Sequence, residues 1–266
     1  MALSMEVRRL TGAGQSPGAG NGPGAGMKPL GAGGRRSRTI TFSYHRRPIR
    51  LAVHSIGGKL DYLGRQIERD GTFWEIDNLQ QTLRFLENGD VVFDCGANIG
   101  NHSVFWSIHG CKVYAFEPDP ENFKLLLRNM EMNNCKGSNF QLLLGDGSDI
   151  TYRVRKNPMN PGNNVYVPHD DGQTASRLDD ICFLPVRLVK IDVEGAEMQV
   201  LRGMDRILKT FHPIVFAEYH CPVVTREQIL RYLNQFGYRN NRDIFLIRDY
   251  VTDSQARALR QKAMRS

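Results

Sequence analysis

Residues 91–119 read VVFDCGANIGNHSVFWSIHGCKVYAFEPD, and this stretch decides the fold. The apolar run Val91–Cys95 is typical of a buried strand that ends at Gly96. We expect a helix at Asn101–His109 and a second buried strand at Cys111–Phe116. Two strands joined through one helix normally run parallel to each other. The stretch therefore predicts the first β-α-β unit of an α/β fold.

The same alternation continues toward the C-terminus. The further strands are expected at residues 140–144, 188–191, 214–217 and 244–247, and the helices at 120–134, 196–208 and 226–236. Alternation with short connections predicts a Rossmann-like, doubly wound and mostly parallel sheet. Residues 148–187 interrupt it with Asn, Pro and Gly, so we expect a hairpin or loop insertion over one end of the sheet.

Composition divides the rest of the chain. Residues 11–34 are nearly all Gly, Ala and Pro, so we expect 1–48 to form a disordered basic arm. A strand and a helical cap are expected at 49–88, the main domain at 89–250 and a C-terminal helical tail at 251–266. Nine of the 35 Lys and Arg residues lie within the first 50 residues, and the remainder of the chain is close to neutral. The basic charge is therefore attributed to the arm, which argues against a nucleic-acid partner.

Two other features limit the class of protein. No apolar run approaches the ~20 residues that a membrane span needs. The five cysteines are scattered and form no C-x-x-C pair, which argues against a disulfide framework or a zinc site. We therefore expect a cytoplasmic protein without a membrane partner.

The first candidate site follows the first strand. Open α/β sheets bind ligands beyond the carboxyl ends of their strands, where the strand order reverses. Asp94, Gly96, Asn98 and Gly100 lie at this position, and the small residues allow a close backbone approach. Asn98 replaces the second glycine of a dinucleotide-binding turn, which argues against NAD.

Carboxylates at successive strand ends indicate the ligand. Glu117 can accept both hydroxyls of a ribose, and Asp146 can accept a hydrogen bond from an adenine amino group. Asp94 suits an ammonium group. Amine, ribose and adenine together make up S-adenosylmethionine, which is the cofactor we predict. In the alternative interpretation, Asp94 and Asp146 are only helix caps.

A second cluster, KIDVEGAE at residues 190–197, follows the fourth strand. Asp192, Glu194 and Glu197 would repel one another if buried together, so they need a cation, a substrate amine or a shared proton. In the alternative interpretation, Glu194 and Glu197 complement the dipole of the next helix.

Glu218 and His220 alternate at the end of the fifth strand and are expected on one face. One acidic or imidazole group of this region would be the base for a substrate hydroxyl. The candidate catalytic residues are Asp192, Glu194, Glu218 and His220. Methyl transfer from a sulfonium needs no Lewis acid, so no metal is expected.

Four segments carry a family resemblance. GANIGNHSVFW, YAFEPDPENFKLLLRNMEMNN, SRLDDI and VRLVKIDVEGAEMQVLRGM resemble the FkbM-type S-adenosylmethionine-dependent methyltransferases, over about residues 72–217. The resemblance implies a class I methyltransferase sheet and O-methylation of hydroxyls on small molecules, such as secondary metabolites, or on sugars. It also implies roles for individual residues: the methionine-end loop at Asp94, Gly96, Asn98 and Gly100, the ribose at Glu117, the adenine at Asp146, and the substrate beside 192–197. His102 fits the family's G-N-H sequence, either in the site or as a packing residue.

Other functions stay open at this point. An RNA or ribonucleoprotein methyltransferase would use the basic arm as a phosphate tether. A non-catalytic S-adenosylmethionine-binding module would keep the fold without turnover. The function that the sequence favours is methylation of a small hydroxylated acceptor.

Overall fold

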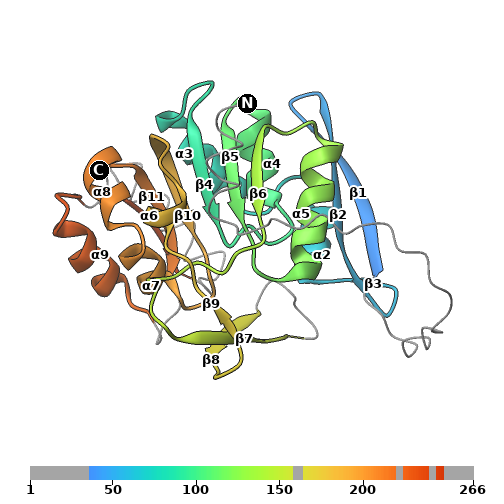
Figure 1. Ribbon diagram of the computed structural model, residues 1–266. Helices are drawn as coiled ribbons and strands as arrows, with labels where there is room; N and C mark the ends of the chain where they lie inside the picture. The colour runs from blue at the N-terminus through green and yellow to red at the C-terminus, as the bar shows by residue number, and fades with distance from the viewer. Residues whose placement is uncertain (1–35, 158–163, 220–223, 240–243, 249–266) are drawn as a thin grey trace, which may run out of the picture.

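A six-stranded sheet with the order β12-β11-β10-β4-β5-β6 forms the centre of the protein (Figure 1). The computed structural model describes residues 36–157, 164–219, 224–239 and 244–248. The strands are β4 (Val91–Cys95), β5 (Lys112–Phe116), β6 (Gly137–Phe140), β10 (Val186–Ile191), β11 (Ile214–Tyr219) and β12 (Ile244–Arg248). All five pairings between them are parallel. The chain builds outward from β4 on one side and from β10 on the other, so the strand order reverses between these two strands.

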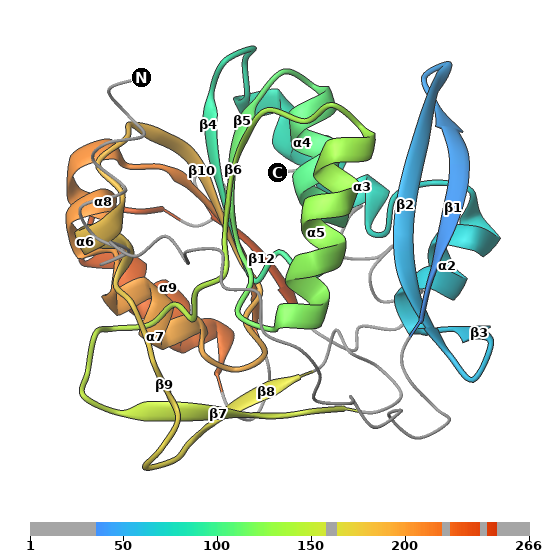
Figure 2. The ribbon, with the colours of Figure 1, turned by 45° about the vertical axis from the view of Figure 1, so that its right-hand side comes forward.

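Helices cover both faces of this sheet (Figure 2). One face carries α3 (Ile76–Thr82), the short 3-10 helix η1 (Leu83–Phe85), α4 (Asn101–Ile108) and α5 (Pro120–Met132). The other face carries α6 (Leu178–Ile181), α7 (Glu197–Arg202), α8 (Asp205–Phe211) and α9 (Arg226–Asn234). Successive residues of β4 point to opposite faces, so Val92 belongs to the first core and Phe93 to the second. The predicted doubly wound α/β fold is confirmed.

Two predicted elements end differently from what the sequence indicated. The helix expected at 196–208 is two helices, α7 and α8, separated at Gly203. A Cβ atom on Gly203 would lie 1.9 Å from the carbonyl oxygen of Gly145, so the break lies where two backbones touch. The strand expected at 140–144 was wrong, since β6 ends at Phe140. Leu144 is buried, but its backbone pairs with Ser176 outside the main sheet. The apolar run at 140–144 indicated burial correctly, but a buried residue need not belong to the central sheet.

The N-terminal part contains the expected strand, within β2 (Arg47–Ile56), and the expected helices, α2 (Tyr62–Asp70) and α3, but the strand belongs to a three-stranded antiparallel sheet that begins earlier in the chain. This sheet consists of β1 (Arg36–Tyr44), β2 and β3 (Lys59–Leu60), and α2 follows it. The expected arm boundary at residue 48 is therefore wrong. Alternate β1 residues, Ile40, Phe42 and Tyr44, are buried, and this period of two marks a strand with one face in the core.

Five of the nine basic residues attributed to the arm belong to this sheet and its turn: Arg36, Arg38, Arg46, Arg47 and Arg50. The rest of the expected arm, residues 1–35, and the expected helical tail, 251–266, lie outside the described residues.

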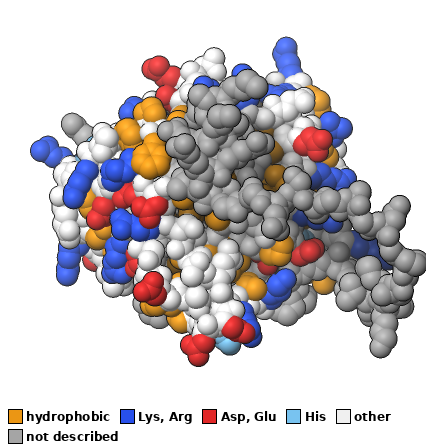
Figure 3. Space-filling view, viewed as in Figure 1, with side chains coloured by type: hydrophobic (Ala, Val, Ile, Leu, Met, Phe, Trp, Pro, Cys, Tyr) orange, Lys and Arg blue, Asp and Glu red, His pale blue; other side chains and the backbone are white. Residues whose placement is uncertain are grey.

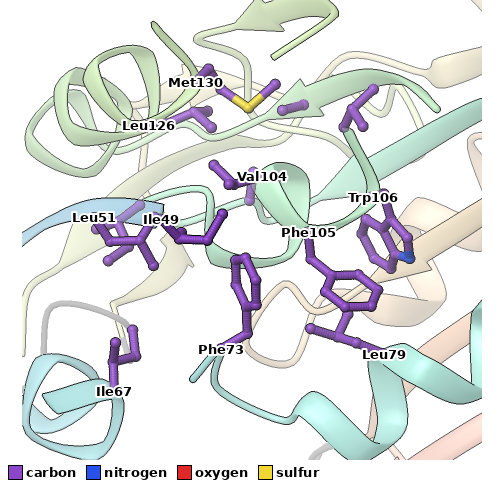
Figure 4. Packing of buried hydrophobic residues seen from close by; sticks show 14 of the residues in the cluster. Ile49, Leu51, Ile67, Phe73, Leu79, Val104, Phe105, Trp106, Leu126 and Met130 are labelled. Carbon is purple, nitrogen blue, oxygen red and sulfur yellow. The ribbon is translucent and has the colours of Figure 1, made fainter. Parts of the chain in front are cut away.

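The N-terminal sheet packs against α5. The Asn129 side chain accepts a hydrogen bond from the Ala52 amide at 2.6 Å and donates to the Ala52 carbonyl at 2.9 Å, as a neighbouring strand would. Figure 4 shows Ile49 and Leu51 of β2 together with side chains of α4 and α5, including Val104 and Leu126. Ala97 and Ile99, in the loop that follows β4, belong to the same core.

The insertion is a second small sheet. It consists of β7 (Thr151–Arg155), β8 (Val165–Pro168) and β9 (Gln173–Thr174), all antiparallel. In Figures 1 and 2 it lies apart from the main sheet, beyond one end of its strands. The predicted insertion is confirmed within 148–187. In the described part of the chain, no helix has the length and apolar character that a membrane crossing requires.

Candidate active site

The loop after β4 is fastened to the end of β5. The amides of Gly96 and Ala97 both donate to the Phe116 carbonyl at 2.9 Å, and the Asn98 amide donates to Glu117 Oε2 at 2.8 Å. Asn98 has a positive φ of 51°, a conformation that Asn adopts more readily than most residues. Backbone contacts therefore bring the ends of the first two strands together.

Glycine is needed in this loop for close backbone packing. A Cβ atom on Gly96, at φ +77°, would lie 1.8 Å from the carbonyl oxygen of Asp192 at the end of β10. A Cβ atom on Gly100, at φ +84°, would lie 2.6 Å from the Leu126 side chain on α5. The sequence suggested that these glycines admit a ligand; the contacts in the structure are with the protein's own β10 and α5.

Asp94 is completely buried at the base of the loop. Ser103 Oγ donates to its Oδ2 at 2.5 Å, and Lys190 Nζ lies 3.2 Å from its Oδ1. The ammonium group that Asp94 meets is thus that of Lys190. A direct contact with the cofactor stays a prediction.

Lys190 joins the two strands at the point where the strand order reverses. Its ammonium group donates to the Gly96 carbonyl at 2.7 Å and lies 3.1 Å from Asp192 Oδ2. Burial alone would lower the pKa of Lys190, but the negative charges of Asp192, Asp94 and Glu218 raise it above its usual value. Lys190 is therefore the cation beside Asp192, one of the three carboxylates that the sequence grouped together. The sequence reasoning gave it no role, although a lysine inside the apolar strand run LVKI signals a buried ion pair.

Glu197 of the carboxylate cluster and the other predicted catalytic residues have different surroundings. Glu197 is fully buried and accepts a hydrogen bond from the Gly195 amide at 2.9 Å, which favours its helix-start interpretation. Glu194 is partly exposed in the turn after β10, at a φ of +54°. Glu218 is partly exposed at the end of β11, close enough to influence Lys190. His220 lies outside the described residues.

The buried carboxylate of Glu117 links the loop after β4 to the start of α5. Besides the Asn98 amide, its carboxylate accepts the Asp119 amide at 3.0 Å and the Asn122 side chain at 3.4 Å. Asn122 Oδ1 in turn lies 2.8 Å from His54 Nε2 on β2. Burial raises the pKa of Glu117 to about 7, against the opposing effect of these hydrogen bonds. The contact of Glu117 with the hydroxyls of a ribose stays a prediction.

Asp146 lies beyond the end of β6, in a partly exposed turn. Its Oδ1 accepts a hydrogen bond from the Ser148 amide at 3.2 Å, which is a local turn contact. Its predicted contact with an adenine stays a prediction.

The start of α4 holds the segment that precedes α3. The Asn101 side chain accepts from the Trp74 amide at 3.1 Å and donates to the Trp74 carbonyl at 3.2 Å. His102 Nε2 lies 3.5 Å from Glu75 Oε2, and both side chains are largely buried. Burial and the positive charge of Lys190 lower the pKa of His102 to about 4, so its ring is neutral at pH 7. The G-N-H sequence therefore fastens residues 74–75 beside the site.

The cluster at the ends of β4, β10 and β11 carries an excess of negative charge. Asp94 and Asp192 lie 3.2 and 3.1 Å from the ammonium of Lys190, and the charge of Glu218 is close enough to raise the pKa of that ammonium. Such a cluster suits a cationic ligand group or a hydroxyl that donates a hydrogen bond. Within the described residues, no three His, Cys, Asp or Glu side chains are grouped so that they could hold a metal ion.

A doubly wound parallel sheet with acidic residues at the strand ends beside its switch point is the architecture of class I methyltransferases. A family model described as the methyltransferase FkbM domain matches residues 94–240, more than half of the chain. The protein belongs to the FkbM methyltransferase family, which confirms the resemblance seen in the sequence. S-adenosylmethionine is its cofactor, as predicted.

Two relatives and one solved structure illustrate the similarity. Hexuronic acid methyltransferase AglP of Haloferax volcanii is 31% identical over 166 residues, covering 56% of this chain and 67% of that protein. Methyltransferase sdnD of Sordaria araneosa is 28% identical over 199 residues, covering 59% of this chain and 77% of that protein. The crystal structure of a methyltransferase FkbM from Methylobacillus flagellatus shares 15% identity and a TM-score of 0.42, covering 67% of this chain and 57% of that one.

Proposed function

We propose that the protein transfers a methyl group to a hydroxyl of a small acceptor, a sugar or a secondary metabolite. The observation that carries this proposal is the Lys190–Asp192 ion pair beside the switch point, with the charge of Glu218 close enough to raise the pKa of Lys190. The similarity to a hexuronic acid methyltransferase favours a sugar among these acceptors.

S-adenosylmethionine supplies the electrophilic methyl group of this reaction. The protein's own part is to position the acceptor oxygen and to receive its proton. Asp192 is about a quarter exposed, so one face of its carboxylate is accessible while Lys190 holds the other. In this proposal Asp192 accepts a hydrogen bond from the acceptor hydroxyl, and Glu218 adds a second negative charge nearby. Glu194 and His220 stay candidate partners of the same hydroxyl.

The test combines a turnover assay with one substitution. Labelled S-adenosylmethionine is incubated with a panel of sugars, hexuronic acids and hydroxylated metabolites, and mass spectrometry detects the methyl group gained. With an acceptor identified, Asp192→Asn should lower kcat by about 100-fold, a common loss for a general base, and leave S-adenosylhomocysteine affinity nearly unchanged. Asp180→Asn, at an exposed position on α6, is the matched control and should retain full activity.

Three outcomes would contradict parts of this proposal. Wild-type turnover in Asp192→Asn would remove Asp192 from the chemistry. Loss of activity with a chelator, restored by Mg²⁺, would show a metal-dependent reaction instead. Tight cofactor binding without transfer to any acceptor of the panel would favour a non-catalytic binding module.

An RNA acceptor is a second candidate, and one observation favours it. Residues 36–60 contain six basic residues and no acidic one, and they form the N-terminal sheet rather than a loose arm. Such a surface attracts polyanions in a salt-dependent way. Methylation of RNA in the same assay, weakened by higher salt, would support this candidate over a small acceptor.

We also propose that the protein works in the cytoplasm. The four described cysteines, Cys95, Cys111, Cys135 and Cys182, are free thiols. Free thiols persist in reducing compartments, where disulfides are rare. Fractionation of cells with an antibody against the protein would test this location.

A further inference from the structure

The insertion sheet is anchored to the element that carries Glu117. Asp119, only 1% exposed, uses Oδ1 to cap α5 by accepting the amides of Glu121 and Asn122 at 2.9 and 3.2 Å. Its Oδ2 accepts a hydrogen bond from Asn164 Nδ2 at 3.2 Å. One buried carboxylate thus holds both the start of α5 and the insertion.

Asn164 and Lys156 complete this anchor. Asn164 is 6% exposed, and its Oδ1 accepts the Asn157 amide at 2.9 Å, so it also ties together the two segments on either side of residues 158–163. Lys156 Nζ lies 3.7 Å from Asp119 Oδ2, an ion pair whose lysine is half exposed. The position of β8 relative to Glu117 is therefore set by hydrogen bonds, one of which involves two buried side chains.

Tyr166 is the residue that this anchor brings to the site. Tyr166 lies on β8, two positions after Asn164, which directly precedes this strand, so the anchor of Asn164 on Asp119 holds the start of β8 beside the segment that carries Glu117. Burial raises the pKa of Tyr166, and the negative charges of Glu117 and Asp119 raise it further, which places its phenol close to both carboxylates. A phenolic hydroxyl beside Glu117 can donate to an oxygen and accept from another donor.

We propose that Tyr166 is a cofactor-binding residue, whose hydroxyl bonds a ribose hydroxyl of S-adenosylmethionine next to Glu117. The insertion then forms part of the wall around the adenosine end, and the Asn164–Asp119 hydrogen bond is its positioning contact. This proposal rests on the cofactor alone and is independent of the acceptor.

Calorimetry with S-adenosylhomocysteine tests the contact. Tyr166→Phe keeps the ring and removes the hydroxyl, so the Kd should rise about 3- to 10-fold, as for a lost neutral hydrogen bond. With the 2′,3′-dideoxy analogue of S-adenosylhomocysteine, the same substitution should change the Kd less than twofold, because the partner hydroxyls are missing. Tyr152→Phe, on the neighbouring strand β7, is the matched control and should leave both Kd values unchanged.

A second variant tests the anchor. Asn164→Ala should weaken S-adenosylhomocysteine binding at least as much as Tyr166→Phe, and the double variant should bind no more weakly than Asn164→Ala alone, because both act through one contact. Far-UV circular dichroism and a thermal melt confirm that each variant is folded. An unchanged Kd in folded Tyr166→Phe would overturn the proposal, as would an equal loss of affinity for both ligands.

Discussion

Single residues at the strand ends of this protein hold neighbouring strands together at the positions where we predict ligand binding. Gly96 illustrates this, because its α-carbon packs against the backbone carbonyl of Asp192 within the loop that we predict to bind the methionine end of the cofactor. Lys190 illustrates it in another way, because one ammonium group fixes the carboxylates of two strands. Removing either residue therefore disturbs the alignment of β4 with β10 and the site above it.

A substitution at Gly96 should be far more harmful than one at an open glycine. Gly96→Ala combines the strain of a positive φ, ~1–2 kcal/mol, with an overlap against backbone that costs ~1–3 kcal/mol. Gly71→Ala is the matched control, since Gly71 has φ +60° and no atom within 4 Å of the added Cβ. Urea unfolding should show a loss of ~1–2 kcal/mol for Gly71→Ala and a clearly larger loss for Gly96→Ala, together with loss of cofactor binding. Equal losses would show that β10 adjusts freely.

The raised pKa of Glu117 predicts a pH dependence of stability. In the unfolded chain this carboxyl titrates near 4.5, and in the folded protein near 7. Between these values the folded state binds more protons, so the stability that Glu117 contributes is complete below about pH 4.5 and is lost as pH rises to about 7.

Glu117→Gln should remove this dependence, because the amide does not titrate. Free energies of unfolding measured by urea between pH 5 and 8 should fall less steeply in Glu117→Gln than in the unsubstituted protein. The variant should also bind S-adenosylhomocysteine more weakly, by about 1.5–3 kcal/mol, the range for hydrogen bonds to a charged group. Parallel stability curves for the two proteins would refute the raised pKa.

At the scale of elements, two small sheets complete the doubly wound core. The N-terminal sheet packs on α5 through Asn129 and a shared apolar core, and the insertion is anchored at the start of the same helix. Because α5 follows directly on Glu117, both additions act on the position of this carboxylate. His54 on β2 reaches it through Asn122.

Strand β1 should be essential to the stability of this arrangement. Phe42 is buried and packs edge-to-face on Phe73, with ring centroids 5.1 Å apart. Phe42→Ala should cost about 3–5 kcal/mol, the usual loss for a buried phenylalanine. Thr41→Ala, at the exposed neighbouring position of β1, should change stability by less than about 0.5 kcal/mol. Thermal and urea unfolding measure both; similar values for the two variants would mean that β1 is not part of the cooperative core.

At the scale of the whole molecule, the site joins two halves of one sheet. The half that begins with β4 carries Glu117, and the half that begins with β10 carries Asp192. On the face drawn in Figure 3, acidic and basic side chains are interspersed over the region of helices α6–α9. The grouping of acidic residues around Lys190 at the switch point thus differs from the mixed charges on this face.

A ligand that bridges both halves should stabilise the whole protein. S-adenosylhomocysteine at 100 times its Kd should raise the free energy of unfolding by about 2.7 kcal/mol, by mass action. NAD at the same concentration should have no effect, because Asn98 stands where a pyrophosphate-binding turn has glycine. Thermal unfolding with each ligand is the measurement. A comparable shift with NAD would contradict the assigned ligand class.

The alternation of apolar strands and amphipathic helices was sufficient to predict the doubly wound sheet. Each buried strand is a local run of apolar residues, and its period is visible without knowledge of its neighbours. The positions of Glu117 and Asp192 at strand ends follow from the same local pattern. The family and its cofactor were predicted from motifs of the same kind, and both are confirmed.

Only the tertiary structure decided which residues meet. Lys190 is close to Asp192 in sequence but far from Asp94, and only the parallel pairing of β4 with β10 places it between the two carboxylates. The folded structure of residues 36–48 likewise depends on residues far away in the sequence. Strand β1 packs in a core that also contains residues of α2 and α4. No local sequence pattern indicated that Tyr166 lies near Glu117. Its position depends on the hydrogen bond between Asn164 and Asp119, which holds the insertion to the start of α5. Local periodicity determines elements, whereas contacts between side chains distant in sequence depend on how those elements pack.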